Sequence, residues 1–209
     1  MTHDADAGRI FVAAVLPDSL REAIRLHLDG ALRGRALPGR TVVSQNWHLT
    51  LRFLGDTSRD ELRTVCDALA TEDLGPSFDV GFTRLGAFPT PARARVLWLG
   101  TGDGADRLCR LAEVVEKVAR SAGFAPEPRP FRPHLTLSRI KPDGDVRALL
   151  AAVPPLEARA RVDELVVFRS HLSPSGPRYE AVRRFRLAAA EAGGTRTHDG
   201  PGACAGRRD

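Results

Sequence analysis

The sequence has little of what marks several common classes of protein. Its 209 residues include 3 cysteines, none paired as CxxC, and no apolar run approaches the roughly 18 residues that span a bilayer. The first residues lack the basic and apolar segments of a secretion signal. These absences argue against a disulfide scaffold, a zinc ribbon or a membrane protein. We expect a monomer in the reducing cytoplasm with no membrane contact.

Lysine is also scarce. Only Lys117 and Lys141 occur, so nearly all of the 31 basic residues are arginines, and with 26 acidic residues the net charge is +5. Guanidinium groups suit bidentate contacts with phosphate. Because most single arginines are ordinary surface residues, charge alone does not identify a function.

Strand-like and helix-like segments alternate without the regular spacing of a doubly wound parallel sheet. Short apolar or β-branched runs predict strands over 9–16, 48–55, 78–87, 94–100, 134–139, 160–168 and 179–187, with a turn over 88–91. Apolar residues at helical spacing predict helices over 18–32, 60–70, 105–122 and 145–153. Because several consecutive strands look like hairpins, we expect an α+β fold.

The two ends of the chain have little to bury. Residues 191–209 contain almost no large apolar side chain, which predicts a disordered tail, and we expect residues 1–8 to be flexible. The residues between them suffice for one sizeable core. We therefore expect a single domain over residues 9–190.

The tetrapeptide HLTL occurs twice, in NWHLTLRFLG and in RPHLTLSRI. The copies begin at His48 and His134, one in each half of the expected domain, which suggests two similar lobes that face one another. In an extended strand alternate side chains share a face, so His48 and Thr50 point away from the leucines. His134 and Thr136 repeat this arrangement. One His-x-Thr strand is unremarkable, and the repetition is the signal.

Two imidazoles and two hydroxyls that converge on one site can hydrolyse a phosphodiester. An unperturbed imidazole has a pKa of about 6.5, so one ring can be neutral and the other protonated near neutral pH. One ring then deprotonates water while the other protonates the departing ribose oxygen. Threonine hydroxyls can hold the phosphoryl oxygens. This scheme requires no metal.

On these motifs the chain resembles the two-histidine (2H) phosphoesterases, and within them the RNA 2′,3′-cyclic phosphodiesterases, once described as 2′-5′ RNA ligases. The resemblance covers nearly the whole expected domain. It rests on the segments RIFVAAVLPDSLREAI, NWHLTLRFLGD, GAFPTPARARVLWLG, RPFRPHLTLSRI and FRSHLSPSGPRYEAVRRFRL. It implies a bilobal α+β fold, with antiparallel sheets facing across a central cleft and helices outside. It also implies that no cofactor is used and that the product is a 2′-phosphate.

The resemblance also implies a role for individual residues. His48 would protonate the leaving oxygen, and His134 would activate water. Thr50 and Thr136 would bind the phosphate oxygens, and Arg139 would add positive charge. Strict alternation from His134 puts Arg139 on the opposite face of the strand, so this role requires a bulge, a bend or the end of the strand. The expected substrate is RNA with a 2′,3′-cyclic phosphate end or a small cyclic phosphate nucleotide.

Residues beside the motifs are further candidates for contacts with RNA. Arginines there can bind backbone phosphate, and aromatic rings can stack on a base. The candidates are Arg52, Phe53, Phe131, Arg132 and Tyr179. For each of them, packing or ordinary surface placement is an equally good interpretation.

Alternative interpretations remain. A noncatalytic RNA-binding module would use the same basic surface, although binding alone does not need a matched acid and base. A metallohydrolase that uses His48 and His134 as ligands would need further ligands, and the sequence has no HExxH motif or carboxylate cluster. A glycine-rich run over 100–105 looks like a dinucleotide-binding turn, but the βαβ unit that it needs is not convincing.

Overall fold

The computed structural model describes residues 8–173 and 176–189 of the chain. Its elements are, in order, β1 (Gly8–Val15), α1 (Asp18–Leu32), β2 (Arg40–Thr41), η1 (Ser44–Asn46), β3 (His48–Thr57), α2 (Arg59–Thr71), β4 (Phe78–Thr90), β5 (Arg93–Thr101), α3 (Ala105–Ser121), β6 (His134–Gly144), α4 (Arg147–Ala152), β7 (Ala158–Val162), β8 (Glu164–His171) and β9 (Arg178–Arg186). The expected flexible start and disordered tail lie outside the described residues, apart from Gly8, which begins β1.

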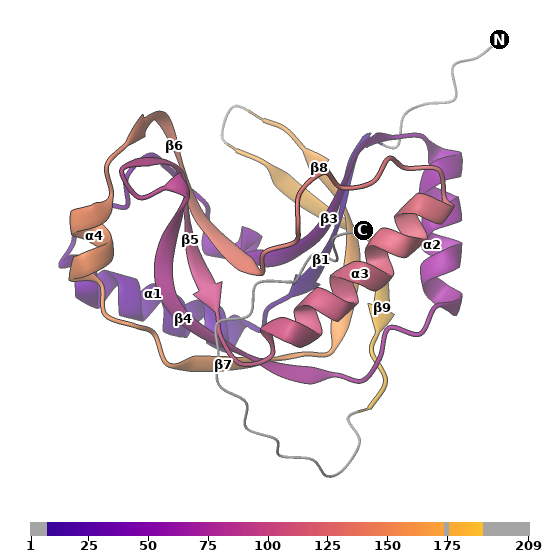
Figure 1. Ribbon diagram of the computed structural model, residues 1–209, viewed down its shortest axis with the longest axis horizontal. Helices are drawn as coiled ribbons and strands as arrows, with labels where there is room; N and C mark the ends of the chain where they lie inside the picture. Colours follow the sequence, from indigo (N-terminus) through magenta and orange to yellow (C-terminus); the bar gives the residue numbers. More distant parts are fainter. Residues whose placement is uncertain (1–7, 174–175, 190–209) are drawn as a thin grey trace.

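The strands form one curled antiparallel sheet with the order β7-β4-β5-β6-β3-β1-β8-β9, and β2 adds to β6 (Figure 1). The sheet has two lobes of four strands, which meet where β3 lies beside β6. Leu49 and Leu135 form the paired positions at this junction, and both are fully buried. Since these leucines hold equivalent places in the two HLTL copies, the two lobes meet at equivalent positions of their strands. The expected bilobal α+β fold is confirmed.

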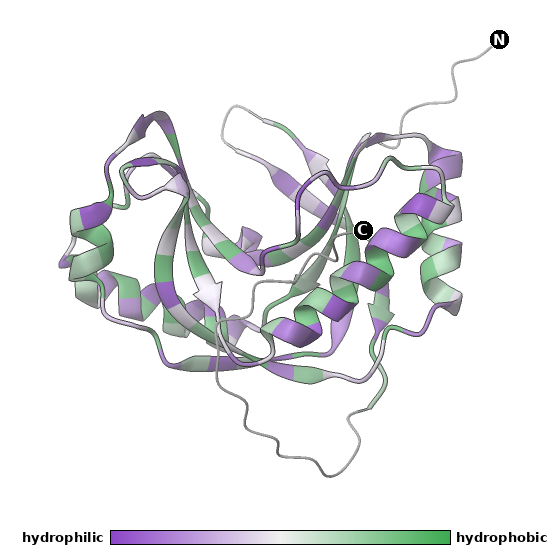
Figure 2. Ribbon diagram, in the orientation of Figure 1, coloured by the Kyte–Doolittle hydropathy of each residue, from purple (hydrophilic) through white to green (hydrophobic). Residues whose placement is uncertain are grey.

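Helices α1 and α3 each pack against the lobe opposite to the one that contains the preceding strand. Helix α1 follows β1 but packs against β7 of the other lobe, and α3 follows β5 but packs against β3. The helices lie on the outside of the curled sheet (Figure 1). Figure 2 shows hydrophobic and hydrophilic residues alternating along the helices and strands, as expected for elements with one buried face.

The predicted strand over 160–168 is wrong in one respect. The segment forms two strands, because β7 pairs with β4 of one lobe and β8 pairs with β1 of the other. The chain therefore passes from lobe to lobe at Asp163, between them. The apolar residues on the two sides of Asp163 do not reveal this change of partner, because residues of both strands are buried: Ala160 and Val162 in β7, and Leu165, Val166 and Val167 in β8.

The predicted turn over 88–91 is too long, since β4 continues to Thr90 and β5 begins at Arg93. The two-residue strand β2 was not predicted. It is preceded by Gly39, whose φ is +78° and whose Cα comes so close to β6 that a Cβ would lie 2.4 Å from the carbonyl oxygen of Arg139. Only glycine fits this position, and it allows β2 to cover the edge of β6 beside the site.

No helix in the described part of the chain is long and apolar enough to cross a membrane.

Candidate active site

The two HLTL strands present their histidines and threonines on the face of the sheet that the helices do not cover. In β3, Leu49 and Leu51 are buried while His48 and Thr50 are half-buried. In β6, Leu135 and Leu137 are fully buried and His134 and Thr136 are half-buried. The leucines anchor each strand against the helices, so the alternation predicted from the sequence is present in both copies.

Both imidazole rings are held in the same way by the backbone. Nδ1 of His48 lies 2.7 Å from the carbonyl oxygen of Asn46, and Nδ1 of His134 lies 2.7 Å from that of Arg132. A carbonyl only accepts, so each Nδ1 carries a hydrogen that it donates. In the neutral ring Nε2 is then left with a lone pair, ready to accept a proton.

The two Nε2 atoms differ in their partners. Nε2 of His48 lies 2.8 Å from Oγ1 of Thr50, so the Thr50 hydroxyl donates to the neutral ring. Within the described residues, no hydrogen-bond partner is found for Nε2 of His134. The lone pair of His134 is therefore available to a water molecule, while that of His48 is already used.

Aromatic rings support each histidine. Phe11 stacks on His48 with ring centroids 4.9 Å apart, and Tyr179 meets it edge-on at 5.3 Å. On the other lobe, Phe88 meets His134 edge-on at 5.1 Å and Trp98 lies at 6.3 Å. No sequence signal singles out Phe11, Phe88 or Trp98, because Phe11 and Trp98 sit in ordinary apolar strand patterns and Phe88 lies in the segment that was predicted to be a turn.

Burial lowers the pKa of both histidines, because the apolar surroundings disfavour the charged ring. The pKa of His48 falls to about 4: burial is the main cause, the hydrogen bond to Asn46 opposes it, and the charges of Arg139 and His134 add to it. The pKa of His134 is also lowered, mainly by burial and then by Arg139. Both rings are therefore neutral in the free protein at neutral pH.

Arg139 shares the face of the histidines because β6 contains the bulge that this placement requires. Leu97 pairs with Ser138 and Trp98 with Thr136, which leaves Leu137 as an extra residue. Leu137 and Ser138 are both fully buried, and the alternation resumes with Arg139 exposed. The guanidinium is close enough to influence both histidines and Tyr179.

The strand β3 has the same bulge, and it moves Arg52 away from the site. Val12 pairs with Arg52 and Ala13 with Thr50, so Leu51 is the extra residue. The exposed fraction of Arg52 is only 9%, on the helix side of the sheet. The prediction that Arg52 could contact phosphate is therefore wrong, because this side chain is buried in the interior of its lobe.

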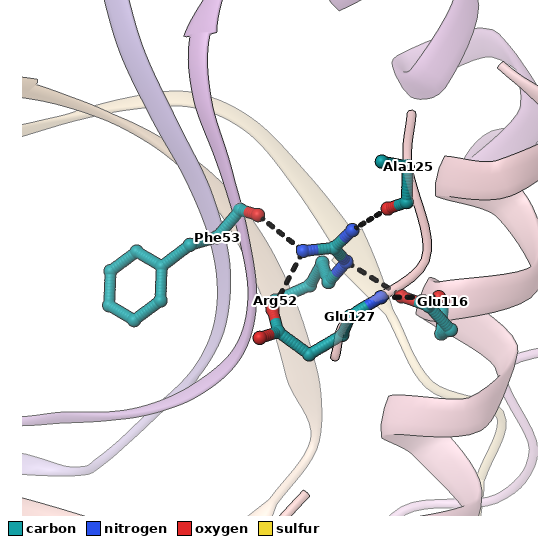
Figure 3. Close-up of polar contacts among 5 residues, drawn as sticks. All are labelled: Arg52, Phe53, Glu116, Ala125 and Glu127. Carbon is teal, nitrogen blue, oxygen red and sulfur yellow. Dashed lines mark hydrogen bonds and ion pairs between the residues drawn. The ribbon is translucent and has the colours of Figure 1, made fainter. Parts of the chain in front are cut away.

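Arg52 joins β3 to α3 and to the segment that leads toward β6 (Figure 3). Its Nε forms an ion pair with Glu116 at 2.6 Å, and Nη1 lies 2.8 Å from Oε2 of Glu127. Nη1 also donates to the carbonyl of Phe53 and Nη2 to that of Ala125. The cluster fixes the segment that continues to His134.

The other candidate residues differ in their exposure and in their contacts with the two histidines. Phe53 is exposed on the histidine face, and its ring lies 5.9 Å from that of Phe11. Arg132 is exposed, and its carbonyl holds His134. Phe131 is half-buried and packs against the core. Tyr179 lies beside His48, as described above.

Within the described residues, no group of three or more His, Cys, Asp or Glu side chains is placed to hold a metal ion.

Comparison with known proteins detects the same duplication, because one family profile matches the chain twice. The profile of the family described as "LigT like Phosphoesterase" matches residues 16–98 and matches again over 99–179. A protein of Aeropyrum pernix named RNA 2′,3′-cyclic phosphodiesterase is 35% identical over 77% of this chain and 93% of its own length. A protein of Escherichia coli with the same name is 31% identical over 88% of this chain and 98% of its own length.

Solved structures give a similar result. The crystal structure of Escherichia coli LigT with 3′-AMP is 28% identical, has a TM-score of 0.74, and covers 88% of this chain and 99% of that one. The crystal structure of a protein of Thermus thermophilus is 28% identical with a TM-score of 0.72, and covers 87% of this chain and 98% of that one.

Replacing Arg52 by methionine should destabilise the protein, because Glu116 and Glu127 would lose the cation that compensates their partial burial. We expect a loss of about 2 kcal/mol in the free energy of unfolding, measured by urea denaturation. Arg63→Met is the matched control, since Arg63 pairs with Asp60 on the exposed surface of α2 and should change stability little. Equal effects of both substitutions would contradict the structural role of Arg52.

The lowered pKa of His48 should make the protein less stable in acid. Between pH 6.5 and about 4 the unfolded chain binds a proton at this histidine and the folded chain does not, so stability falls as the pH falls through this window. Carboxylates also titrate in acid, so the comparison is with His48→Gln. From pH 7.5 to 5, wild type should lose about 2 kcal/mol more than the variant in urea denaturation. Parallel losses would mean that His48 titrates normally.

Proposed function

Since the chain belongs to the LigT-like phosphoesterase family, we propose that it hydrolyses the 2′,3′-cyclic phosphate ends of RNA to 2′-phosphates by general acid-base catalysis with two histidines. The proposal rests on one observation above all. His48 and His134 occupy equivalent places on two joined lobes, each with Nδ1 fixed by a backbone carbonyl. Nε2 is therefore the ring atom for proton transfer in both, and in the free protein that of His48 accepts from the Thr50 hydroxyl. The relatives named RNA 2′,3′-cyclic phosphodiesterase support the same substrate class.

In the proposed step, a water oxygen attacks phosphorus while the bond from phosphorus to the ribose 3′ oxygen breaks. Nε2 of His134 takes a proton from the water, and Nε2 of protonated His48 gives a proton to the 3′ oxygen. The phosphate stays on the 2′ oxygen. The histidines end with their protonation states exchanged, and exchange of protons with solvent restores them. The acid and the base in this scheme are both side chains of the protein.

The different surroundings of the two rings support these roles. Nε2 of His134 has no partner among the described residues, so it can accept from an attacking water directly. His48 needs a proton to act as an acid, although its pKa in the free protein is about 4. A phosphate anion bound beside the ring favours the charged form and offsets the effect of Arg139. Substrate binding therefore helps to supply the acid.

The phosphate group would be held by residues on both lobes. In this proposal Thr50 and Thr136 donate hydroxyl hydrogens to the nonbridging oxygens, one from each side, and the Thr50 hydroxyl becomes free to do so when Nε2 of His48 is protonated. Arg139 is exposed on the same face, and its charge lowers the pKa of both histidines. Arg132 is exposed directly before β6 and can contact a second phosphate of an RNA strand. Fixed donors of this kind stabilise the charge that develops in the transition state.

Hydrolysis of an RNA oligonucleotide with a 2′,3′-cyclic phosphate end, in the presence of a chelator, tests the proposal. Wild type should release only the 2′-phosphate. Each of His48→Ala and His134→Ala should lower kcat/KM by about 10²- to 10⁴-fold, because each removes one proton transfer. Thr50→Val and Thr136→Val should have smaller effects, because the histidines remain. The position of the phosphate is read by nuclease mapping or NMR.

His27 offers a matched control, because it lies on α1 with Nε2 at 3.0 Å from the carbonyl oxygen of Pro154, away from the two HLTL strands. His27→Ala should keep wild-type turnover. Activity that the chelator abolishes would favour a metallohydrolase. Bound RNA without turnover by wild type would instead favour a noncatalytic RNA-binding module.

The pH dependence of kcat/KM should show the lowered pKa values directly. The productive free enzyme has one protonated and one neutral histidine, and both pKa values lie below 6.5. We therefore expect kcat/KM to rise as the pH falls from 8 to about 6. Arg139→Gln should move this limb to higher pH, because it removes a positive charge that lowers both pKa values. A wild-type limb above pH 8 would contradict the assignment.

A further inference from the structure

Beyond Arg139, strand β6 leaves its regular pairing with β5. Val96 pairs with Arg139 and Ala94 with Gly144, so residues 140–143 lie opposite the single residue Arg95. This wide bulge opens a hollow of about 720 Å³, a volume typical of ligand pockets. The hollow is lined by Arg95, Ile140, Lys141, Pro142 and Asp143. It therefore begins directly after Arg139, which the proposed function places against the cyclic phosphate.

The hollow has a net positive charge. Arg95 and Lys141 are both exposed, and within the described part of the chain neither has an acidic partner. The carboxylate of Asp143 also lines the hollow, but it lies 3.1 Å from Nε of Arg93, which compensates its charge. The charges of Arg95 and Lys141 therefore remain to attract an anion.

Lys141 lies on the same face of β6 as Arg139. Both side chains are exposed, and the buried Ile140 lies between them. Side chains alternate along an extended strand, and two steps of the strand span about 6.6 Å. This separation is similar to that between the phosphates on the two sides of one ribose. One anion beside Arg139 and another beside Lys141 therefore match the two phosphates of one nucleotide in an RNA chain.

The other lobe, formed by β3, β1, β8 and β9, differs at the equivalent place. Counted from the two HLTL histidines, Gly55 corresponds to Lys141 and Asp56 to Pro142. Strand β3 remains paired with β1 through both residues, and the exposed Asp56 stands opposite Arg9. An acid opposite a base does not favour an anion, and a free carboxylate repels phosphate. The positive hollow thus distinguishes the end of β6 from the matching end of β3.

The chemistry of an RNA 3′ end fits this arrangement. The nucleotide with the cyclic phosphate is joined to the rest of the chain only through its 5′ oxygen, so the RNA leaves the site in one direction. The first phosphate in that direction is the internucleotide phosphate. A lysine ammonium and an arginine guanidinium are both common phosphate ligands. The apolar surfaces of Ile140 and Pro142 suit the ribose and base of the preceding nucleotide.

We propose that Lys141 and Arg95 bind the internucleotide phosphate next to the cyclic end, and that the hollow between them holds the preceding nucleotide. This inference rests on the proposed function and adds that the substrate is an RNA chain and not a single nucleotide. The chain leaves the site past Lys141. Arg132, which precedes β6 at its other end, is the competing position for this phosphate.

The test compares two dinucleotides that both end in a 2′,3′-cyclic phosphate, one with an ordinary linkage and one with an uncharged methylphosphonate linkage. In wild type the ratio of their kcat/KM values should favour the ordinary linkage by about 10-fold or more, because only this linkage gains a charge-assisted contact. Lys141→Gln and Arg95→Gln should each lower the ratio, and the double variant should bring it close to equality. Lys141→Arg, which keeps the charge, should preserve the ratio.

Lys117→Gln is the matched control. Lys117 is the other lysine of the chain, and it lies on α3 with Nζ 2.7 Å from Oε1 of Glu72. Because it removes the same charge outside the hollow, this substitution should leave the ratio unchanged. A ratio that falls equally in Lys117→Gln and Lys141→Gln would mean that only the net charge matters, and would overturn the inference.

Two further outcomes would also overturn it. The first is a wild-type ratio close to equality. The second is a ratio that survives Lys141→Gln and Arg95→Gln but falls in Arg132→Gln, which would direct the RNA past the start of β6.

If wild type hydrolyses neither dinucleotide, the proposed function fails, and calorimetry then tests the hollow separately. A dinucleotide that ends in a 2′-phosphate should bind more tightly with the ordinary linkage than with the methylphosphonate linkage. Lys141→Gln should remove most of this difference. Equal affinities of the two ligands for wild type would overturn the inference.

Discussion

One extra residue in each HLTL strand decides which side chains reach the candidate site. The bulges at Leu51 and Leu137 put two consecutive residues on the helix side of the sheet and then restore the alternation. As a result Phe53 and Arg139 join the face of the histidines, while Arg52 and Ser138 are buried behind it. The burial of the leucines compensates for the disturbed hydrogen bonding of the strand. In regular strands, Arg52 would face the site and Arg139 would not.

The orientation and the tautomer of both histidine rings are fixed by contacts within the protein. The carbonyl oxygen two residues earlier fixes each ring and its tautomer, and aromatic side chains hold the ring from the side. The same aromatic packing removes water and lowers both pKa values, so the rings are neutral in the free protein. The aromatic packing therefore both orients the histidine rings and buries them. An anion bound beside the rings favours their charged form and so opposes the effect of burial on the pKa.

Duplication by itself produces a site with two equal halves, whereas a nucleotide has different ends. The two lobes carry matched residues at the histidines and threonines, to which the proposed function gives the proton transfers and the phosphate contacts. The lobes differ further along the same face, where Phe53 of one lobe stands in the position of Arg139 of the other. The crossed helices and the junction of Leu49 with Leu135 hold the two halves in register, so this difference has a fixed geometry.

The sequence alone determined the duplicated motif, the α+β class, most strands and helices, and the equivalent places of His48 and His134 in the two copies. The repeat is read directly from the sequence, and the strands and helices follow from the local spacing of apolar residues within each segment. The lobe to which a strand belongs was decided only by tertiary contacts, as the break at Asp163 shows. Likewise, the sequence does not show which of the consecutive residues Arg52 and Phe53 faces the interior. Only the bulge, which depends on pairing with β1, sends Arg52 inward to Glu116 and leaves Phe53 at the surface.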